Sequence, residues 1–186
     1  MESFEEQAIR ACQKGDLEKF GALYDKYIGK IYDFIYFRLH HQQQAEDLTS
    51  LVFLKAIEKI SSYNFNKGAF STWLYKIARN ALIDHFRSTK KEQNLETVWD
   101  LSDDQDIEQD TDNQAQWKKV QTYLDKLEKE QREIILFRVW DGLSYQEIAE
   151  ITGRTPAALK MAFSRAINKL RQDQAFALII LLLIIK

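Results

Sequence analysis

The stretch Gly142–Arg171, GLSYQEIAEITGRTPAALKMAFSRAINKLR, decides the fold of the C-terminal half of the chain. Ser144 and Glu147 have the spacing of a capping box, which satisfies unpaired amide groups at the start of a helix. Gly153 stands where this short helix must end, because glycine readily adopts the left-handed conformation of a helix terminus. Thr155 followed by Pro156 marks a second helix start. The pattern predicts a helix-turn-helix.

The second helix of this pair is basic. Residues 154–171 contain no acid and five cations: Arg154, Lys160, Arg165, Lys169 and Arg171. A short helix, a tight turn and a basic helix suit insertion of a helix end into the major groove of DNA. The alternative is two packed helices with a solvated basic face.

The composition favours a nearly all-α protein without catalytic or metal chemistry. The 186 residues include one proline and six glycines, and period-two apolar runs are rare. The single cysteine, Cys12, excludes an internal disulfide, and we expect it to be a small buried residue. Because no C-x-x-C or H-x-x-x-H spacing is present, we expect no metal, no cofactor and no enzymatic activity.

Acidic residues gather in one segment. Residues 92–115 contain nine of the 28 acids and no basic residue. The other 19 acids face 26 basic residues, so the rest of the chain carries a net charge of +7 although the whole chain carries −2. A segment this acidic and poor in apolar residues is typical of a flexible linker. We therefore expect domains at residues 1–91 and 116–172.

Apolar residues recur at helical spacing on both sides of this linker. In the N-terminal part they predict two helices within residues 5–37, broken at Gly15–Asp16 with Asp16 as a cap. A polar connection at 40–44, a third helix at 45–60, a loop at 61–68 and a fourth helix at 70–91 follow. In the C-terminal part they predict helices at 116–127 and up to Gly142 before the helix-turn-helix. The predicted fold is all-α, with two small helical domains.

The fourth helix, FSTWLYKIARNALIDHFRSTKK, combines positive charge with aromatic rings. Residues 73–91 contain five Lys or Arg and one acid. Cations interleaved with aromatic rings suit single-stranded nucleic acid, because the cations neutralise phosphate and the rings stack on unpaired bases. The spacing leaves open whether Trp73 is a core residue or a stacking surface. Arg79 and Arg87 also fit an ordinary solvated face.

Three motifs in order resemble one family. They are AEDLTSLVFLKA at 45–56, FSTWLYKIARNALIDHFR at 70–87, and YLDKLEKEQREIILFRVWDGLSYQEIAEITG at 123–153, followed by the basic helix. Over about residues 5–172 the chain resembles a bacterial RNA polymerase sigma factor of the small two-domain, extracytoplasmic-function (ECF) class. The resemblance implies a cytoplasmic factor that binds core RNA polymerase, directs it to specific promoters and promotes DNA melting.

The resemblance also implies partners and site residues. The partners are the β′ and β subunits of core polymerase, promoter DNA as duplex and as single strand, and an anti-sigma factor. A region 2-like domain at 1–91 would contact polymerase through Asp47, Leu48, Ser50 and Phe53. It would read the unpaired downstream promoter element through Trp73, Lys76, Arg79, Asn80, Asp84 and Arg87. A region 4-like domain at 116–172 would read the upstream duplex through Thr155, Ala157, Ala158, Lys160, Met161, Ser164 and Arg165.

Two segments depart from the family pattern. Ser50–Leu51 replaces a Gln-Glu pair in the third helix, so we expect an altered polymerase contact. Residues 158–162, ALKMA, replace a T-V-K-S-R-like run in the recognition helix. Few polar side chains of long reach remain there, so base reading would rely more on apolar contact with thymine methyl groups.

The C-terminal tail, residues 173–186, lies outside the family pattern. Residues 175–185, AFALIILLLII, are uncharged and almost wholly apolar. As a helix they would extend about 16 Å, against a hydrocarbon layer of roughly 30 Å. Packing on the protein or on a partner is therefore favoured over membrane contact. Two alternative functions remain, a polymerase-independent helix-turn-helix regulator and a membrane-associated adaptor that uses the tail.

Overall fold

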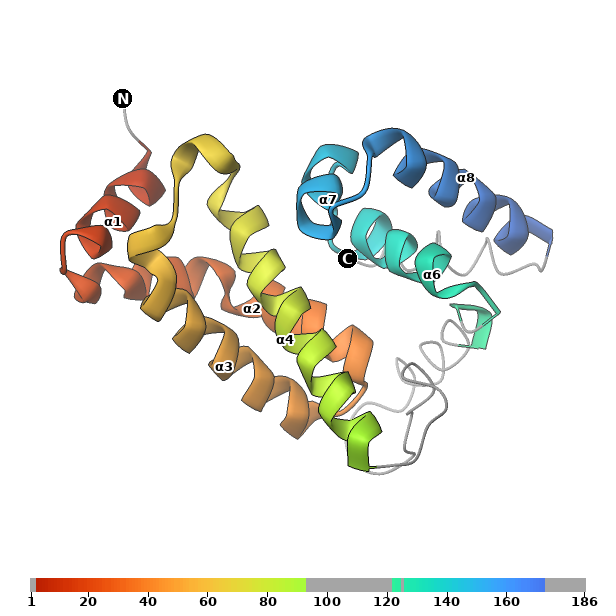
Figure 1. Cartoon of the computed structure of the whole chain (residues 1–186), viewed down its shortest axis with the longest axis horizontal. Coiled ribbons are helices and arrows are strands. Elements are labelled where there is room, and N and C mark those ends of the chain that lie inside the picture. Colours follow the sequence, from red (N-terminus) through yellow and green to blue (C-terminus); the bar gives the residue numbers. More distant parts are fainter. Residues whose placement is uncertain (1–2, 93–121, 125, 173–186) are drawn as a thin grey trace. The chain divides into compact units, whose positions relative to one another are not determined.

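The computed structural model describes residues 3–92, 122–124 and 126–172, and every regular element in these ranges is helical (Figure 1). The all-α class predicted from the sequence is confirmed. The chain divides into two compact units, Met1–Ile107 and Glu108–Lys186. The predicted linker beyond Glu92, the helix predicted from residue 116 as far as residue 121, and the tail lie outside the described residues. No described helix has the length and apolarity to cross a membrane.

The first unit is built around one long helix. Its elements are α1 (Phe4–Gln13), η1 (Leu17–Lys19), α2 (Phe20–Leu39), α3 (Gln42–Lys59) and α4 (Phe70–Glu92). Helix α2 contacts α1, α3 and α4, and its central residues Ile31, Phe34 and Ile35 are fully buried. The edge of the Phe34 ring meets Tyr75 of α4, with 5.1 Å between ring centroids. Aromatic packing on α2 thus fixes the face that α4 leaves exposed.

The predicted helix boundaries are partly correct. The chain breaks at Gly15, whose φ is +100°, as expected. The cap predicted at Asp16 is wrong, because the Asp16 side chain makes no capping hydrogen bond and a short 3-10 helix follows it. Helix α3 begins at Gln42, earlier than expected. His41 supplies the cap, since its Nδ1 accepts the Gln44 N–H at 3.3 Å.

The loop predicted at 61–68 is partly helical. It contains two short 3-10 helices, η2 (Ile60–Ser62) and η3 (Phe65–Lys67). The Asn64 carboxamide oxygen accepts the Asn66 N–H at 2.9 Å, which starts η3. Gly68, with a φ of +128°, then turns the chain into α4. These local bonds give the connection a defined path instead of an open loop.

The second unit contains α6 (Lys129–Ile135), α7 (Tyr145–Thr152) and α8 (Pro156–Gln172). The helix predicted to run up to Gly142 changes at Leu136–Trp140 into a π-helical stretch, in which the Asp141 N–H reaches the Leu136 carbonyl at 2.9 Å. Helix α8 contacts both α6 and α7. Its buried side joins a core of Leu124, Leu127, Ile135, Leu136, Ala166 and Leu170.

The helix-turn-helix signals are confirmed. The Ser144 hydroxyl accepts the Glu147 N–H at 3.2 Å, and the Glu147 carboxylate accepts the Ser144 N–H at 2.8 Å. Gly153 ends α7 in the left-handed conformation, with a φ of +75°. The Thr155 hydroxyl accepts the Ala158 N–H at 3.3 Å and so caps α8. Short-range hydrogen bonds therefore set the turn between the two helices.

We expect Gly153→Ala to destabilise the helix-turn-helix. A methyl group at Gly153 would meet no atom within 4 Å, so the cost is the strain of an L-residue at a φ of +75°, about 1–2 kcal/mol. Hydrogen exchange of the α7 and α8 amides in the full chain measures this change. The control is Gly29→Ala in α2, which also meets open space but has an ordinary helical φ and should stabilise α2 by up to about 1 kcal/mol. Unchanged exchange in Gly153→Ala would contradict the prediction.

Candidate nucleic-acid interface

Helix α4 presents a mixed polar face. Lys76, Asn80, Asp84 and Arg87 are exposed, and their spacing of three or four residues aligns them along one side of the helix. Arg87 and Asp84 approach to 4.0 Å, with both side chains largely exposed, so this ion pair contributes little to stability. Arg79 is half-buried. The face thus offers two cations, a carboxamide and a carboxylate in a row.

Trp73 is both a packing residue and a partly accessible one. Its ring is half-buried and lies 5.4 Å from Tyr63 and 5.3 Å from Phe70, measured between centroids. Tyr63 and Phe70 are buried, and they hold the indole from the core side. A ring supported in this way is suited to stacking because little freedom is lost when a base packs on it. The core packing of Trp73 is therefore observed, and stacking on its accessible part stays a prediction.

The positive charge of α4 comes from lysine and arginine and not from histidine. His85 is half-buried, and this burial lowers the pKa of its imidazole below the ordinary value. The ring is therefore neutral near pH 7. Lys76, Arg79 and Arg87 supply the charge, while the side chains of Lys90 and Lys91 lie outside the described residues. Within the described ranges, no group of three or more His, Cys, Asp or Glu side chains is arranged to hold a metal ion.

Helix α3 places the four residues matched to polymerase contact on two different sides. Asp47 and Ser50 are exposed. Leu48 and Phe53 are only 7% and 4% exposed, and the Phe53 ring packs against Tyr24 with 4.8 Å between centroids. Their side chains therefore belong to the core of this unit, and their part in polymerase contact stays a prediction.

The outward side of α3 carries two leucines, of which the sequence interpretation noted Leu51 beside Ser50 and missed Leu54. Leu51 is 39% exposed and Leu54 is 54% exposed. Together with Asp47 and Ser50 they form what we call the α3 outer face. A helical wheel would have found them, because these positions follow the i, i+3, i+4, i+7 spacing opposite the buried row. An apolar centre with a polar rim is the ordinary composition of a protein interface.

Helix α8 separates its buried and exposed sides cleanly. The residues matched to DNA reading are exposed, except for half-buried Ala158: Thr155, Ala157, Lys160, Met161, Ser164 and Arg165. Met161 is 62% exposed, and it is the single large apolar side chain with such exposure among the described residues of the second unit. Leu159 and Ala162, on the other side, are 1% exposed.

Three contacts tie the helix-turn-helix to the elements before it, one at the turn that precedes α8 and two at the start of α7. The Arg154 guanidinium forms an ion pair with Glu130 of α6 at 2.9 Å. Arg138 donates to the Leu143 carbonyl and lies over the Tyr145 ring, 4.7 Å from its centroid. These contacts hold the start of α7 and the turn against α6 and the π-helical stretch. The exposed end of α8 is thereby presented on a fixed support.

Comparison with known families identifies both units. The model of Sigma-70 region 2 matches residues 23–92, and the model of Sigma-70, region 4 matches residues 117–170. The ECF RNA polymerase sigma factor SigW of Bacillus subtilis is 30% identical, and the alignment covers 93% of this chain and 98% of SigW. The ECF sigma factor BldN of Streptomyces coelicolor is 32% identical, and the alignment covers 88% of this chain and 63% of BldN.

Solved structures show the same fold. CnrH, solved with the cytosolic domain of CnrY, superposes with a TM-score of 0.71 at 18% identity. The match covers 91% of this chain and 96% of the CnrH chain. The sigma factor RpoE of Bartonella quintana, solved with the anti-sigma factor NepR, superposes with a TM-score of 0.64 at 26% identity. That match covers 83% of this chain and 96% of RpoE.

The two sides of α3 should respond differently to truncation. We expect Phe53→Ala to lower the free energy of unfolding by about 3–5 kcal/mol, because it leaves a cavity in the core. Leu54→Ala should change it by no more than about 0.5 kcal/mol, because the side chain is more than half exposed. Urea unfolding of the full chain measures both variants. Equal destabilisation would show that α3 has a different rotation about its axis.

Proposed function

The chain belongs to the ECF family of RNA polymerase sigma factors, and on that premise we propose how its own residues carry out the work of a sigma factor. The chain binds core RNA polymerase, directs the polymerase to promoters and promotes DNA opening. It does so through binding energy alone, because the chain makes or breaks no covalent bond. The observation that carries the proposal is the exposure, on α4 and α8, of the polar side chains matched to promoter reading. On the same helices, Leu74 and Ala78 of α4 and Leu159 and Ala162 of α8 are buried.

The work is divided between two DNA-binding domains. Residues 1–91 form the region 2-like domain, residues 116–172 the region 4-like domain, and residues 92–115 the acidic linker. Two modest DNA contacts joined by a linker reinforce each other when both sites are within reach, because the second contact becomes intramolecular. Neither domain then needs high affinity by itself.

Polymerase binds the α3 outer face. Leu51 and Leu54 form the apolar centre, and Asp47 and Ser50 form the polar rim. Leu48 and Phe53 support this face from inside the core. The contact of this chain is therefore more apolar than the Gln-Glu pair of the family pattern would make it. The β′ and β subunits of core polymerase are the proposed partners.

The downstream promoter element is read as an unpaired strand on α4. Trp73 offers a supported ring for stacking, and Asn80 offers a carboxamide that can hydrogen-bond a base edge. Lys76, Arg79 and Arg87 neutralise backbone phosphates, and Asp84 lies beside Arg87 on the same face. Capture of unpaired bases shifts the equilibrium of the promoter toward the open form.

The upstream element is read as duplex by α8. Lys160 and Arg165 have the reach to contact phosphate or guanine, and Ser164 and Ala157 allow close approach of the helix. Thr155, at the capped N-terminus, lies where helix amides favour a phosphate. Ala158 is half-buried and supports the helix more than it contacts DNA. Met161 contributes an apolar contact with a thymine methyl group.

We also propose an anti-sigma factor as a partner and the cytoplasm as the place of action. The RpoE structure of Bartonella quintana contains the anti-sigma factor NepR, which makes an inhibitor of this chain a reasonable expectation. An inhibitor that covers the α3 outer face would block polymerase binding directly. Core polymerase and promoters are cytoplasmic in bacteria, so the function requires the same location for this chain.

Run-off transcription with bacterial core polymerase on a pooled promoter library tests the proposal. We expect transcripts with defined starts that depend on the chain, and Leu54→Asp should weaken core binding at least tenfold, about 1.4 kcal/mol. The matched control is Leu17→Asp in η1, which alters a leucine that is 49% exposed and lies outside α3, and it should bind normally. If the chain fails to bind core, a stand-alone helix-turn-helix regulator is the better reading.

Met161 predicts sensitivity to a single methyl group in the promoter. Replacement of a contacted thymine by uracil removes one methyl group and should weaken duplex binding about fourfold, since a buried methylene is worth about 0.8 kcal/mol. Met161→Ala should abolish the difference between thymine and uracil duplexes. Lys160→Ala serves as the control. It should weaken binding to every duplex and reduce the slope of log K against log salt concentration by about 0.9, while the difference between thymine and uracil duplexes remains. Equal uracil effects in wild type and Met161→Ala would refute the methyl contact.

A further inference from the structure

Helix α1 holds the connection between α3 and α4 through one glutamine. The Gln13 carboxamide donates one hydrogen to the Ile60 carbonyl at 3.1 Å and one to the Tyr63 carbonyl at 2.8 Å. Both bonds are partly buried and join positions 47 and 50 residues apart. A primary amide has two N–H donors, so both are committed to this connection. Gln13 therefore bridges the exit of α3 and the turn that follows it.

A second contact from α1 reaches the far part of the same connection. The Arg10 guanidinium lies over the Phe65 ring, 4.6 Å from its centroid, at a distance that gives a cation–π attraction. Phe65 in turn packs edge-on against Tyr63, with centroids 5.0 Å apart. Helix α1 thus contacts both 3-10 segments of the connection, at η2 through Gln13 and at η3 through Arg10.

The connection passes these restraints on to the DNA-reading helix. The Tyr63 hydroxyl donates to the Gly68 carbonyl at 3.0 Å, just before α4 begins. The Tyr63 ring also lies 5.4 Å from Trp73, the stacking residue of the proposed function. The connection has five exposed polar residues: Ser61, Ser62, Asn64, Asn66 and Lys67. A shift of Tyr63 would therefore move both these polar groups and the ring beside them.

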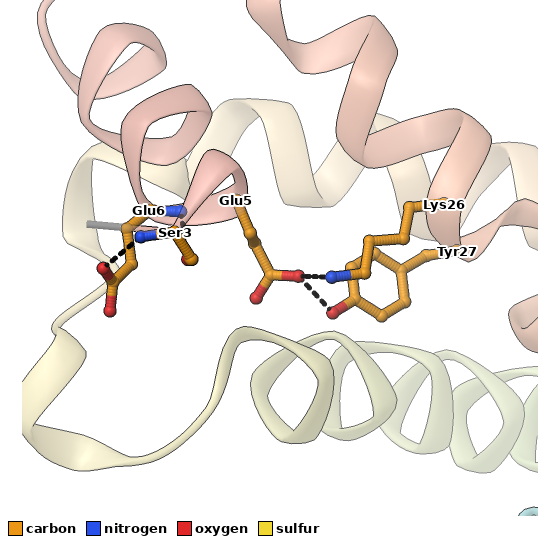
Figure 2. A network of polar contacts seen from close by, with 5 residues as sticks. All are labelled: Ser3, Glu5, Glu6, Lys26 and Tyr27. Carbon is orange, nitrogen blue, oxygen red and sulfur yellow. Dashed lines mark hydrogen bonds and ion pairs between the residues drawn. The ribbon is translucent and has the colours of Figure 1, made fainter. Parts of the chain in front are cut away.

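Helix α1 is itself firmly placed on α2. Figure 2 shows the Glu5 carboxylate pointing at Lys26 and Tyr27, and the Tyr27 hydroxyl donates to it at 2.7 Å. Burial, and next the hydrogen bond to Glu5, raise the pKa of Tyr27 above its ordinary value, so this donor stays protonated. The capping box of Ser3 and Glu6, also in Figure 2, closes the first turn of α1. A helix anchored in this way can act as a rigid brace.

We propose that Gln13 is a positioning residue for promoter reading, which braces residues 60–68 so that this connection and Trp73 discriminate the bases of the unpaired downstream strand. The inference rests on the proposed function. It extends the strand-reading site to α1, which precedes the segment matched by the region 2 family model, residues 23–92. Gln13 touches no base in this scheme and acts through the backbone of Ile60 and Tyr63.

Strand discrimination by the assembled holoenzyme tests the proposal. Fluorescent single strands that carry the downstream element enriched in the run-off library are compared with scrambled strands, and the ratio of the two affinities is measured. This ratio does not depend on the fraction of folded protein, so a loss of stability alone would not change it. We expect Gln13→Ala to lower the ratio about fivefold. Gln13→Glu should lower it further, because a carboxylate would face two carbonyl oxygens.

Lys14→Ala is the matched control. Lys14 is the exposed neighbour of Gln13, and its recorded hydrogen bonds come from its backbone N–H, so its removal should leave the ratio unchanged. If Gln13→Ala does not fold, Arg10→Gln tests the proposal instead. Arg10 is exposed, so this variant should fold, and loss of its contact with Phe65 should lower the affinity ratio about twofold. Core binding should be normal in every folded variant.

The outcomes separate this inference from the proposed function. If the wild-type holoenzyme prefers the downstream-element strand and folded Gln13→Ala shows the same affinity ratio, the bracing role of Gln13 alone is overturned. A wild-type holoenzyme that binds both strands equally overturns strand reading by this chain and the brace with it. A fall in the ratio in Gln13→Ala but not in Lys14→Ala supports both.

Discussion

The burial of one side of each short helix is the constraint on which the rest of the structure depends. In α8, Leu159, Ala162, Ala166 and Leu170 are at most 2% exposed, and this row fixes the rotation of the helix about its axis. Every exposed side chain of α8 is then determined, since side chains three or four residues apart share a face. The same rule orients α3 and α4. In small domains such as these, core packing and the proposed DNA-reading surface are two sides of the same helices.

Aromatic packing extends this constraint from single helices to the reading site. Between ring centroids, Tyr27 of α2 lies 5.7 Å from Phe70, Phe70 lies 5.5 Å from Tyr63, and Tyr63 lies 5.4 Å from Trp73. Each ring restricts the next, so the position of the half-buried indole is set by buried residues. Such preorganisation lowers the entropy cost of stacking an unpaired base. It also explains how an aromatic-rich α2 would support the function proposed for α4.

The parts of the structure that depend on neighbouring residues could be predicted from the sequence, and the parts that depend on distant contacts could not. The capping box at Ser144, the turn at Gly153 and the start of α8 are local and were predicted correctly. The cap at Asp16 was wrong, because a 3-10 helix, not an α-helix, follows it. No local pattern reveals the bonds of Gln13 to the far end of α3, which become visible only in three dimensions. The roles of Leu48 and Phe53 came from motif matching, which ignores which side of α3 faces the core.

The two proposed reading surfaces differ in chemistry, and the bivalent design explains why both are sufficient. At its positions matched to DNA reading, helix α8 offers two long cations, small residues and one exposed methionine, which together read few base edges. Helix α4 and the connection before it offer carboxamides, hydroxyls and a supported ring, which suit unpaired bases. Because the two contacts are joined by one chain, their binding energies combine once polymerase holds both near a promoter. A recognition helix with little discrimination of its own is therefore tolerable when the strand-reading surface is rigid.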